Sequence, residues 1–392
     1  MQEAFFSRLG EQLSGGLPFA AYRKPEGSAI VALLQQDAEL HKEGALERPG
    51  FVFAGFRDPE DCILIPLEAS ERLELGAGEL SFEKASEKAP ESVTEADVTG
   101  NNISDSEVFS EDRAKQQHLA LVERGIAVLK TGALEKVVLS RKEPIPLREQ
   151  DPLQLFRELL ITYPTAFVYL WYHPEVGLWL GATPETLLQV EGLNFKTMAL
   201  AATQKYAGSL DVSWGAKEKQ EQQFVTDSIV ENLQGLQAVA EMKLTEPFTT
   251  RAGGLVHIRT DITGRLRSSE NLKQIVHALH PTPAVCGLPK EKARDFILKE
   301  EGYDREYYTG FLGELNFRET RSRSRNRRNT ENLAYAAVKR STSLYVNLRC
   351  MKLSGGIAEL FIGGGITKDS NAESEWQETQ NKAQTMKKVI LK

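Results

Sequence analysis

The chain has 392 residues, of which 41% are hydrophobic and 26% charged, and these are ordinary proportions for a globular protein. They exclude a disordered, collagenous or repeat-built chain, and the length allows two or three domains or one large one. The net charge of −7 gives nucleic acid no general electrostatic attraction. The three cysteines lie far apart, which argues against a disulfide framework and for a reducing, cytoplasmic location.

Nothing in the sequence indicates export or membrane insertion. The first residues carry acidic and polar side chains where a signal peptide needs an apolar core. The longest apolar run, Ala166–Tyr172, is far shorter than the roughly 20 residues of a membrane-spanning helix. Its aromatic and β-branched residues are typical of a buried strand, and we expect no membrane partner.

The N-terminal part, up to about Leu80, mixes short apolar runs with Gly and Pro, which predicts strands and short helices without recognisable chemistry. Residues Glu83–Arg113 are acidic and almost free of large apolar side chains, which is typical of an exposed connection. A helix is expected between Asp112 and Lys130, then a strand at Lys136–Lys142 and a second helix at Leu153–Thr162.

The remaining chain alternates strand and helix patterns. Four strands between residues 166 and 203 predict a meander. The longest helical pattern is Lys217–Met242, and Leu255–Leu266 alternates polar and apolar residues as a half-buried antiparallel strand does. Leu344–Lys352 is one of two late strands before a terminal helix at Ala372–Leu391. This order predicts an α+β fold in which large antiparallel sheets form the core and helices flank them.

An arginine-rich segment, Arg318–Arg328, holds six arginines in eleven residues. It could be an RNA-binding arm. It has no interleaved aromatic residue for base stacking and lies within an acidic protein, so we favour a solvated surface loop and expect no nucleic-acid partner.

The common nucleotide, metalloprotease and serine-nucleophile motifs are absent from the sequence. The six histidines show no metal-ligand spacing with cysteine, so any metal should be held by oxygen. Glu221 lies in the long helical pattern, and Glu375 with Glu378 lies at i and i+3 in the terminal helix, which puts two carboxylates on one face. Such carboxylates suit Mg²⁺, although acidic residues in a first turn usually just complement the helix dipole.

Lys136 and Glu185 are ambiguous when each is taken alone. Lys136 lies among Val and Leu in a strand, where a lysine can lose its proton and act as a base, or can simply pair with Glu135. Glu185 follows Thr-Pro at the end of a strand, where it could start a helix or act as an acid in a cleft. The residues by themselves leave these alternatives open.

Eight ordered blocks run from about Arg113 to the C-terminus: EKVVLSR (Glu135–Arg141), GATPETLL (Gly181–Leu188), MALAAT (Met198–Thr203), KEKQEQQFV (Lys217–Val225), HPTPAVCGLP (His280–Pro289), YDREYYTGFLGE (Tyr303–Glu314), LYVNLRC (Leu344–Cys350) and GGGITKDSNAESEWQET (Gly363–Thr379). In this order they resemble the chorismate-utilising enzymes, which include isochorismate and salicylate synthases and the large chains of anthranilate and aminodeoxychorismate synthase. The resemblance implies that family's single fold, with residues 1–112 as its variable N-terminal half and acidic linker, and residues 113–392 as the chorismate-binding catalytic region.

The resemblance also selects among the family's reactions. Ala201 stands where aminodeoxychorismate synthases of the lysine-nucleophile type have Lys, and Ala199 stands where anthranilate-type chains usually have Pro. Lys136 looks like the water-activating lysine of isochorismate and salicylate synthases. We therefore expect a Mg²⁺-dependent isomerase, an isochorismate synthase that serves menaquinone or catechol siderophore synthesis. A salicylate synthase, or an anthranilate or aminodeoxychorismate synthase component, is the alternative.

In the implied reaction, Lys136 takes a proton from a water that attacks C2 of chorismate, and Glu185 gives one to the departing C4 hydroxyl. By resemblance, Glu221 and Glu375, with Glu378 acting through water, would hold Mg²⁺ on the ring carboxylate. The substrate-binding residues that the resemblance implies are Thr203, His280, Tyr345, Arg349 and Gly364.

Arg349, with Tyr345 beside it in the predicted strand, matches the family's clamp for the enolpyruvyl carboxylate. The amides of Gly363–Gly365 could add donors as an anion nest. Two positions depart from the family pattern, because Gln222 stands where His is usual and Ala202 where Gly is usual. A catalytically inactive scaffold is a further alternative, disfavoured because the implied catalytic residues are all present. We expect a monomer or weak homodimer.

Overall fold

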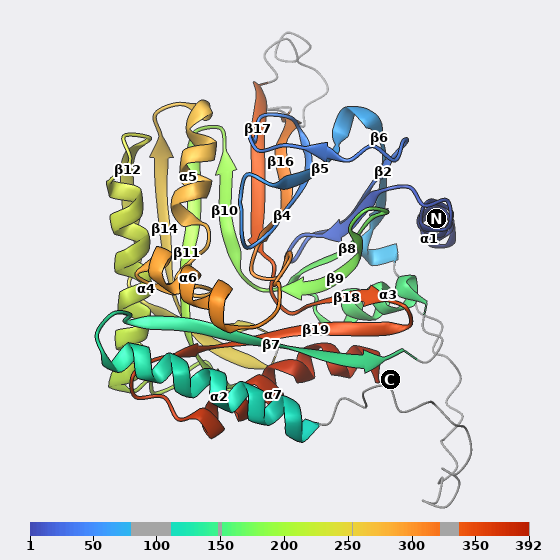
Figure 1. Cartoon of the computed structure of the whole chain (residues 1–392). Helices are drawn as coiled ribbons and strands as arrows, with labels where there is room; N and C mark the ends of the chain where they lie inside the picture. Colours follow the sequence, from blue (N-terminus) through green and yellow to red (C-terminus); the bar gives the residue numbers. More distant parts are fainter. Residues whose placement is uncertain (80–110, 148–150, 253, 322–336, 392) are drawn as a thin grey trace, which may run out of the picture.

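The computed structural model of the protein describes residues 1–79, 111–147, 151–252, 254–321 and 337–391. Within these ranges two large antiparallel β-sheets pack against each other, and helices cover their outer faces (Figure 1). The predicted α+β class is thereby confirmed. Most of the acidic connection and of the arginine-rich segment lies outside the described residues. No helix in the described part of the chain is long and apolar enough to cross a membrane.

The first sheet has nine strands. In spatial order they are β15 (Gly287–Leu288), β7 (Lys136–Pro146), β19 (Ile357–Ile366), β18 (Cys350–Ser354), β9 (Gly177–Thr183), β8 (Phe167–His173), β1 (Phe19–Arg23), β2 (Ala29–Gln35) and β6 (Ser70–Gly76). The N-terminal strands β1, β2 and β6 thus complete one end of a sheet whose other end is built from strands that begin at Lys136 or later.

The second sheet has ten strands. In spatial order they are β12 (Val239–Leu244), β14 (Leu255–Leu266), β11 (Asn194–Lys205), β10 (Thr186–Glu191), β17 (Ala337–Val346), β16 (Phe311–Arg321), β4 (Gly50–Ala54), β5 (Cys62–Pro66) and β3 (His41–Lys42), with β13 (Phe248–Ala252) also paired to β14. Here too the N-terminal strands, β3 to β5, form one end.

The α-helices of the described residues are α1 (Gln2–Ser14), α2 (Glu111–Lys130), α3 (Pro152–Thr162), α4 (Ala216–Gln234), α5 (Leu272–Leu279), α6 (Lys290–Glu300) and α7 (Ala372–Ile390). Three short 3₁₀ turns, Leu67–Ala69, Ala77–Glu79 and Ser269–Asn271, complete the description. Apolar side chains of α1, α3 and α7 pack on the first sheet, and those of α4 and α5 pack on the second. Helices α2 and α6 pack beside β7.

The run that forms β8 is apolar throughout because both of its faces are buried. Val168 and Leu170 belong to the core under the helices, whereas Phe167, Tyr169 and Trp171 belong to the aromatic core between the sheets. Alternate side chains of a strand point to opposite faces, so this one segment contributes to both cores.

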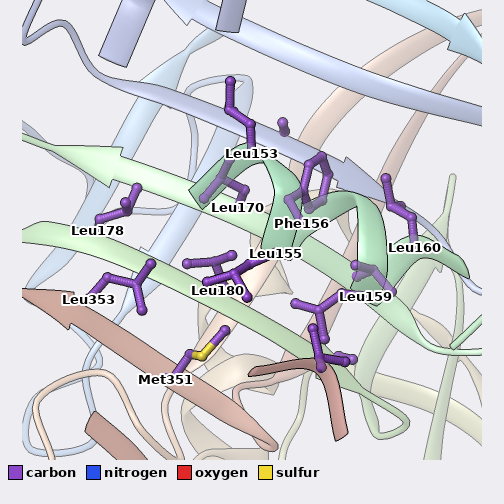
Figure 2. Close-up of a cluster of buried hydrophobic side chains, with 14 of the residues drawn as sticks. Leu153, Leu155, Phe156, Leu159, Leu160, Leu170, Leu178, Leu180, Met351 and Leu353 are labelled. Carbon is purple, nitrogen blue, oxygen red and sulfur yellow. The ribbon is translucent and has the colours of Figure 1, made fainter. Parts of the chain in front are cut away.

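Helix α3 packs on the outer face of the first sheet. Its side chains, Phe156 among them, lie over Leu170 and Leu180 of the sheet (Figure 2). Asp151 begins the helix by accepting a hydrogen bond from the amide of Leu153. Phe156 is fully buried, and truncating such a side chain to Ala typically costs about 3–5 kcal/mol.

Several predicted elements are confirmed at nearly the predicted bounds, namely α2, α3, β14 and α7. The predicted meander is wrong. Strands β8 and β9 pair in the first sheet, β10 and β11 pair in the second, and the chain passes between the sheets at Pro184–Glu185. The helix expected at Lys217–Met242 ends at Gln234, where Gly235 caps it, and the rest forms a turn and β12.

The predicted strand Leu344–Lys352 is also two strands. Strand β17 ends at Val346 in the second sheet, and β18 begins at Cys350 in the first. Arg349 therefore lies in the connection between the sheets and not beside Tyr345 within one strand. Asn347 and Arg349 alternate with apolar residues across this break, as polar residues do within a half-buried strand, so the sequence pattern does not reveal it.

Candidate active site

The two connections between the sheets lie against each other. The amide of Val346 donates to the carbonyl of Glu185 at 3.0 Å, and the amide of Ala182 donates to the carbonyl of Arg349 at 3.1 Å. Arg349 has a φ of +49°, a left-handed conformation that persists only where surrounding structure holds it. These hydrogen bonds bring an acidic and a basic residue, 164 positions apart in the printed numbering, to one place.

A cavity of about 240 Å³ opens beside these connections. Strands of both sheets, helices α4 and α7 and the segment Ala284–Val285 contribute to its walls. Eight of the ten predicted site residues line it: Lys136, Glu185, Thr203, Glu221, Arg349, Gly364, Glu375 and Glu378. Its volume is slightly below the roughly 300–1,000 Å³ typical of drug-sized ligands, which suits a small substrate.

The structure does not bring His280 and Tyr345 to this cavity. His280 packs edge-on against Phe311, and burial lowers its pKa to about 3. Tyr345 stacks on Phe167 with 4.1 Å between the ring centroids, inside the aromatic core between the sheets. The block that contains His280 still reaches the cavity through Ala284 and Val285.

Lys136 projects from β7 and forms an ion pair with Glu221 of α4, with 2.7 Å between Nζ and Oε1. The lysine side chain is 4% exposed and that of Glu221 is 24% exposed, so the pair lies at the wall between protein and cavity. Gly365 of β19 leaves the room for it, because a Cβ at that position would meet Lys136 Cε at 3.0 Å. The sequence prediction placed both residues in one site but not in direct contact.

The anion nest expected at Gly363–Gly365 is not formed. These glycines lie inside β19 and pair with Val138–Ser140 of β7, so they have extended backbone. Their lack of side chains has a different consequence. A Cβ at Gly363 would meet the hydroxyl of Tyr308 at 2.6 Å, and one at Gly364 would meet Glu375 Oε2 at 3.6 Å. The glycines therefore keep one wall of the cavity free of side chains.

Glu185 is 4% exposed and faces the cavity from the first of the two connections. Burial raises the pKa of its carboxyl to about 7, against the weaker opposing effects of Lys136, Thr282 and Arg349. The hydroxyl of Thr282 lies at 3.5 Å from its Oε1, a long contact. A carboxyl with this pKa can hold a proton near neutral pH and release it to a reacting group.

Two helices each present a pair of carboxylates to the cavity. Glu218 and Glu221 lie at i and i+3 on α4, and Glu375 and Glu378 lie at i and i+3 on α7. Glu218 was not among the residues predicted from the sequence, although Glu218 and Glu221 repeat the spacing of Glu375 and Glu378. In the described residues, no three of these four bring oxygens within 4.8 Å of one another.

A second lysine lies among these carboxylates and was also missed. Lys382 lines the cavity, pairs with Glu378 at 2.6 Å and donates to the carbonyl of Gly363 at 3.1 Å. Its spacing of four residues from Glu378 is a recognisable helical ion-pair signal. The carboxylate groups are thus held by ammonium groups, Lys136 on one side and Lys382 on the other.

His257, another residue absent from the sequence prediction, lines the cavity opposite a bulge in β11. Ala201 pairs with Ile258 and Gln204 with Val256, so Ala202 and Thr203 together face His257. His257 Nδ1 lies 2.9 Å from the carbonyl of Ala202 and 3.2 Å from the hydroxyl of Thr203. Burial lowers its pKa to about 4, which keeps the imidazole neutral at pH 7.

Ala202 and Gln222, which depart from the family pattern, lie in the bulge of β11 and behind the cavity. Ala202 has a φ of +58°, a conformation in which glycine is favoured. The buried amide of Gln222 lies behind the cavity and donates to the carbonyl of Ala199 at 3.1 Å and to the hydroxyl of Thr260 at 3.1 Å. Gln222 thereby ties α4, which carries Glu218 and Glu221, to β11 and β14.

Comparison with known proteins identifies the family of the chain. A family model described as chorismate binding enzyme matches residues 68–321, and a second of the same description matches residues 333–388. The salicylate biosynthesis isochorismate synthase of Pseudomonas aeruginosa is 30% identical over 284 residues, which cover 70% of this chain and 55% of that protein. Isochorismate synthase EntC of Escherichia coli K12 is 28% identical over 298 residues, covering 74% of this chain and 70% of EntC. The chain thus spans between about half and three quarters of these relatives.

The fold has solved counterparts as well. The structure of MenF, the menaquinone-specific isochorismate synthase from Escherichia coli, matches with a TM-score of 0.69 and 21% identity, covering 95% of this chain and 88% of MenF. At 21% identity, this similarity supports a shared fold.

Proposed function

The chain belongs to the chorismate-binding enzymes, and we propose that it is an isochorismate synthase, an isomerase that moves the ring hydroxyl of chorismate. Water adds at C2 while the C4–O bond breaks and the ring double bonds shift, so one water enters and one leaves. The observation that carries the proposal is the common cavity of Lys136 and Glu185. The names of the relatives from Pseudomonas aeruginosa and Escherichia coli support it.

We assign the general base to Lys136 and the general acid to Glu185. To take a proton from the attacking water, Lys136 must be a neutral amine, so the proton that its ammonium shares with Glu221, 2.7 Å away, must pass to Glu221 or to solvent before the step. Glu185 meets the requirement for the acid, because burial raises its pKa to about 7 and leaves much of it protonated near neutral pH. The proton that it gives to the C4 oxygen lets that oxygen leave as water.

Arg349 is the proposed partner of the enolpyruvyl carboxylate, since a guanidinium can bind a carboxylate through two parallel hydrogen bonds. Its side chain lines the cavity, and burial lowers its pKa. An anionic group would compensate the unfavourable burial of this charge. Thr203, His257 and Gly364 line the remaining wall against which the ring would lie.

The carboxylates of α4 and α7 fit a hard divalent cation, because all four donors are oxygens and Mg²⁺ is usually held by one or two carboxylates together with water and substrate. We propose that Glu221 and Glu375, with Glu378 through water and Glu218 close by, would hold Mg²⁺. Bound there, the ion would neutralise a substrate carboxylate. The spread of the four groups favours a site completed by substrate and water.

The other expectations from the sequence stay proposals. We propose that residues 1–112 are a variable half of the fold and that residues 113–392 carry the catalysis, since all the described residues that line the cavity come from Lys136 onward. We also propose a cytoplasmic location, which the three unpaired, buried cysteines support. The proposed product would serve menaquinone or catechol siderophore synthesis.

The proposal is tested by incubating the purified protein with chorismate and Mg²⁺ and separating the products by chromatography. We expect isochorismate, and we expect Lys136→Ala to lower kcat by about 10²–10⁴-fold with KM for chorismate nearly unchanged. Lys142→Ala, a lysine of the same strand that pairs with Glu306 and Glu359, is the matched control. Salicylate as the main product, or anthranilate formed with ammonia, would replace the proposal by the corresponding activity.

A further inference from the structure

A buried ion pair lies just behind the cavity wall. Glu301, at the end of α6, and Arg305 have side chains that are each 1% exposed, and Arg305 Nε donates to Glu301 Oε2 at 2.7 Å. Neither residue lines the cavity. Burying two charges costs free energy that an apolar pair of the same size would not cost, so a stabilising role alone does not account for this pair.

One side of the pair holds the strand of the proposed base. Arg305 Nη2 donates to the carbonyl of Val138 at 2.7 Å. Glu301 Oε1 accepts from the backbone amide of Ser140 at 2.7 Å and from its hydroxyl at 2.9 Å. Val138 and Ser140 follow Lys136 by two and four residues in β7. The pair therefore fixes the backbone of β7 directly beyond Lys136.

The other side of the pair holds the segment beside the proposed acid. Arg305 Nη1 donates to the carbonyl of Val285 at 3.0 Å and to the hydroxyl of Thr309 at 3.2 Å. Val285 lines the cavity, and its amide donates to the carbonyl of Thr282, whose hydroxyl contacts Glu185. One planar guanidinium thus joins the wall that carries Lys136 to the wall that packs on Glu185.

We propose that Arg305 is a positioning residue that sets the separation of Lys136 and Glu185 across the substrate, a role that rests on the proposed function. The two amino groups of a guanidinium diverge in a fixed plane and hold both carbonyls at a fixed separation and direction, which the freely rotating ammonium of a lysine does not impose. The ring of Phe56 lies 4.5 Å from the guanidinium carbon and supports this orientation. A base and an acid that act on opposite ends of one ring tolerate little change in spacing, since a misplacement of about 1 Å can cost about 10²-fold in rate.

The test compares Arg305→Lys with the control Arg124→Lys. Arg124 is an exposed arginine of α2 that pairs with Glu300, the last residue of α6. We expect Arg305→Lys to lower kcat by about 10–100-fold while KM for chorismate stays within about threefold, because Arg349 and the carboxylates are untouched. The alkaline limb of the pH–rate profile should move to lower pH, since a looser 282–285 segment admits water to Glu185 and weakens the burial that raises its pKa. The control should leave all three quantities at parental values.

A purely structural role would give a different result. Activity would then fall only in proportion to the folded fraction seen by circular dichroism, with KM and the pH profile parental, and this outcome overturns the proposal. If Arg305→Lys does not fold, Ser140→Ala serves instead, because it removes only the hydroxyl that contacts Glu301 and Tyr303.

A readout without turnover separates this inference from the proposed function. Stability at pH 5 and pH 8 is measured for four proteins: the parent, Glu185→Gln, Arg305→Lys and the double variant. Glu185→Gln should change the difference in stability between pH 5 and pH 8 less in the Arg305→Lys protein than in the parent. An equal effect in both backgrounds contradicts the positioning role even if the parent makes a different product or none.

Discussion

Replacing Glu185 with Gln should make the protein more stable at pH 8 while removing most of its activity. The carboxyl is 4% exposed, and burial raises its pKa from the ordinary 4.5 to about 7. The folded state therefore binds this proton more tightly than the unfolded state does. The stabilising contribution of this bound proton is fully present below the unfolded pKa of 4.5 and is lost as the pH rises through about 7.

The size of this effect follows from the displacement of the pKa, which corresponds to roughly 3 kcal/mol. Gln keeps the shape of the side chain and carries no charge, so the variant should lack this loss of stability. Urea unfolding at pH 5 and pH 8 measures most of it: the parent should lose about 2.5 kcal/mol more than Glu185→Gln over this range. Glu246→Gln, at an exposed position between β12 and β13, is the control and should match the parent.

Activity should change in the opposite sense to stability. The amide cannot donate the proton that the C4 oxygen needs, so kcat should fall by about 10²–10⁴-fold, and the parental rate should decline as the pH rises through about 7. Two results would refute this reasoning: a Glu185→Gln protein with the parental pH dependence of stability, or one that still makes isochorismate at the parental rate. The first would mean that the carboxyl reaches solvent, and the second that it is not the acid.

Two further predictions concern the carboxylates and the bulge. Glu375→Gln should raise the Mg²⁺ concentration for half-maximal activity at least about tenfold and weaken Mn²⁺ binding measured by electron paramagnetic resonance, and unchanged binding would remove this residue from the metal site. Ala202→Gly should leave the free energy of unfolding equal or up to about 1 kcal/mol higher, because relief of the left-handed φ outweighs the entropy of glycine. Ala199→Gly, at an ordinary φ in the same strand, should destabilise by about 1 kcal/mol, and equal losses in urea unfolding for both variants would contradict the argument.

The sequence predicted elements well and their assignment to sheets poorly. Helices α2, α3 and α7 follow from the spacing of their apolar residues, which is a local property. The chain crosses between the sheets at Glu185 and at Arg349, and no local sequence pattern marks either crossing. Each crossing is defined by the pairing of its flanking strands with strands more than 150 residues away. Hairpin signals alone made the meander the simplest interpretation.

The candidate site shows the same division. Lys136, Glu221, Glu375 and Glu378 were assigned through the family resemblance of their sequence blocks. The choice between His257 and His280, in contrast, depends on the register of β11 against β14. A bulge of one extra residue in β11 places Ala202 and Thr203 opposite His257. The sequences of the two strands do not predict this bulge. Tyr345 was expected beside Arg349 because a continuous strand would keep them together, and the break at residues 347–349 separates them.

The arrangement of the two sheets keeps the N-terminal half of the fold away from the cavity. Strands β1, β2 and β6 extend the first sheet and β3 to β5 extend the second, always at the end away from β7 and β14. They supply much of the aromatic core between the sheets, such as Tyr22, Phe51 and Phe53, but none of the residues that line the cavity. Changes in this half that conserve buried volume should therefore alter the stability of the sandwich. They should not alter the geometry around Glu185 and Arg349, because hydrogen bonds from Ala182 to Arg349 and from Val346 to Glu185 fix it.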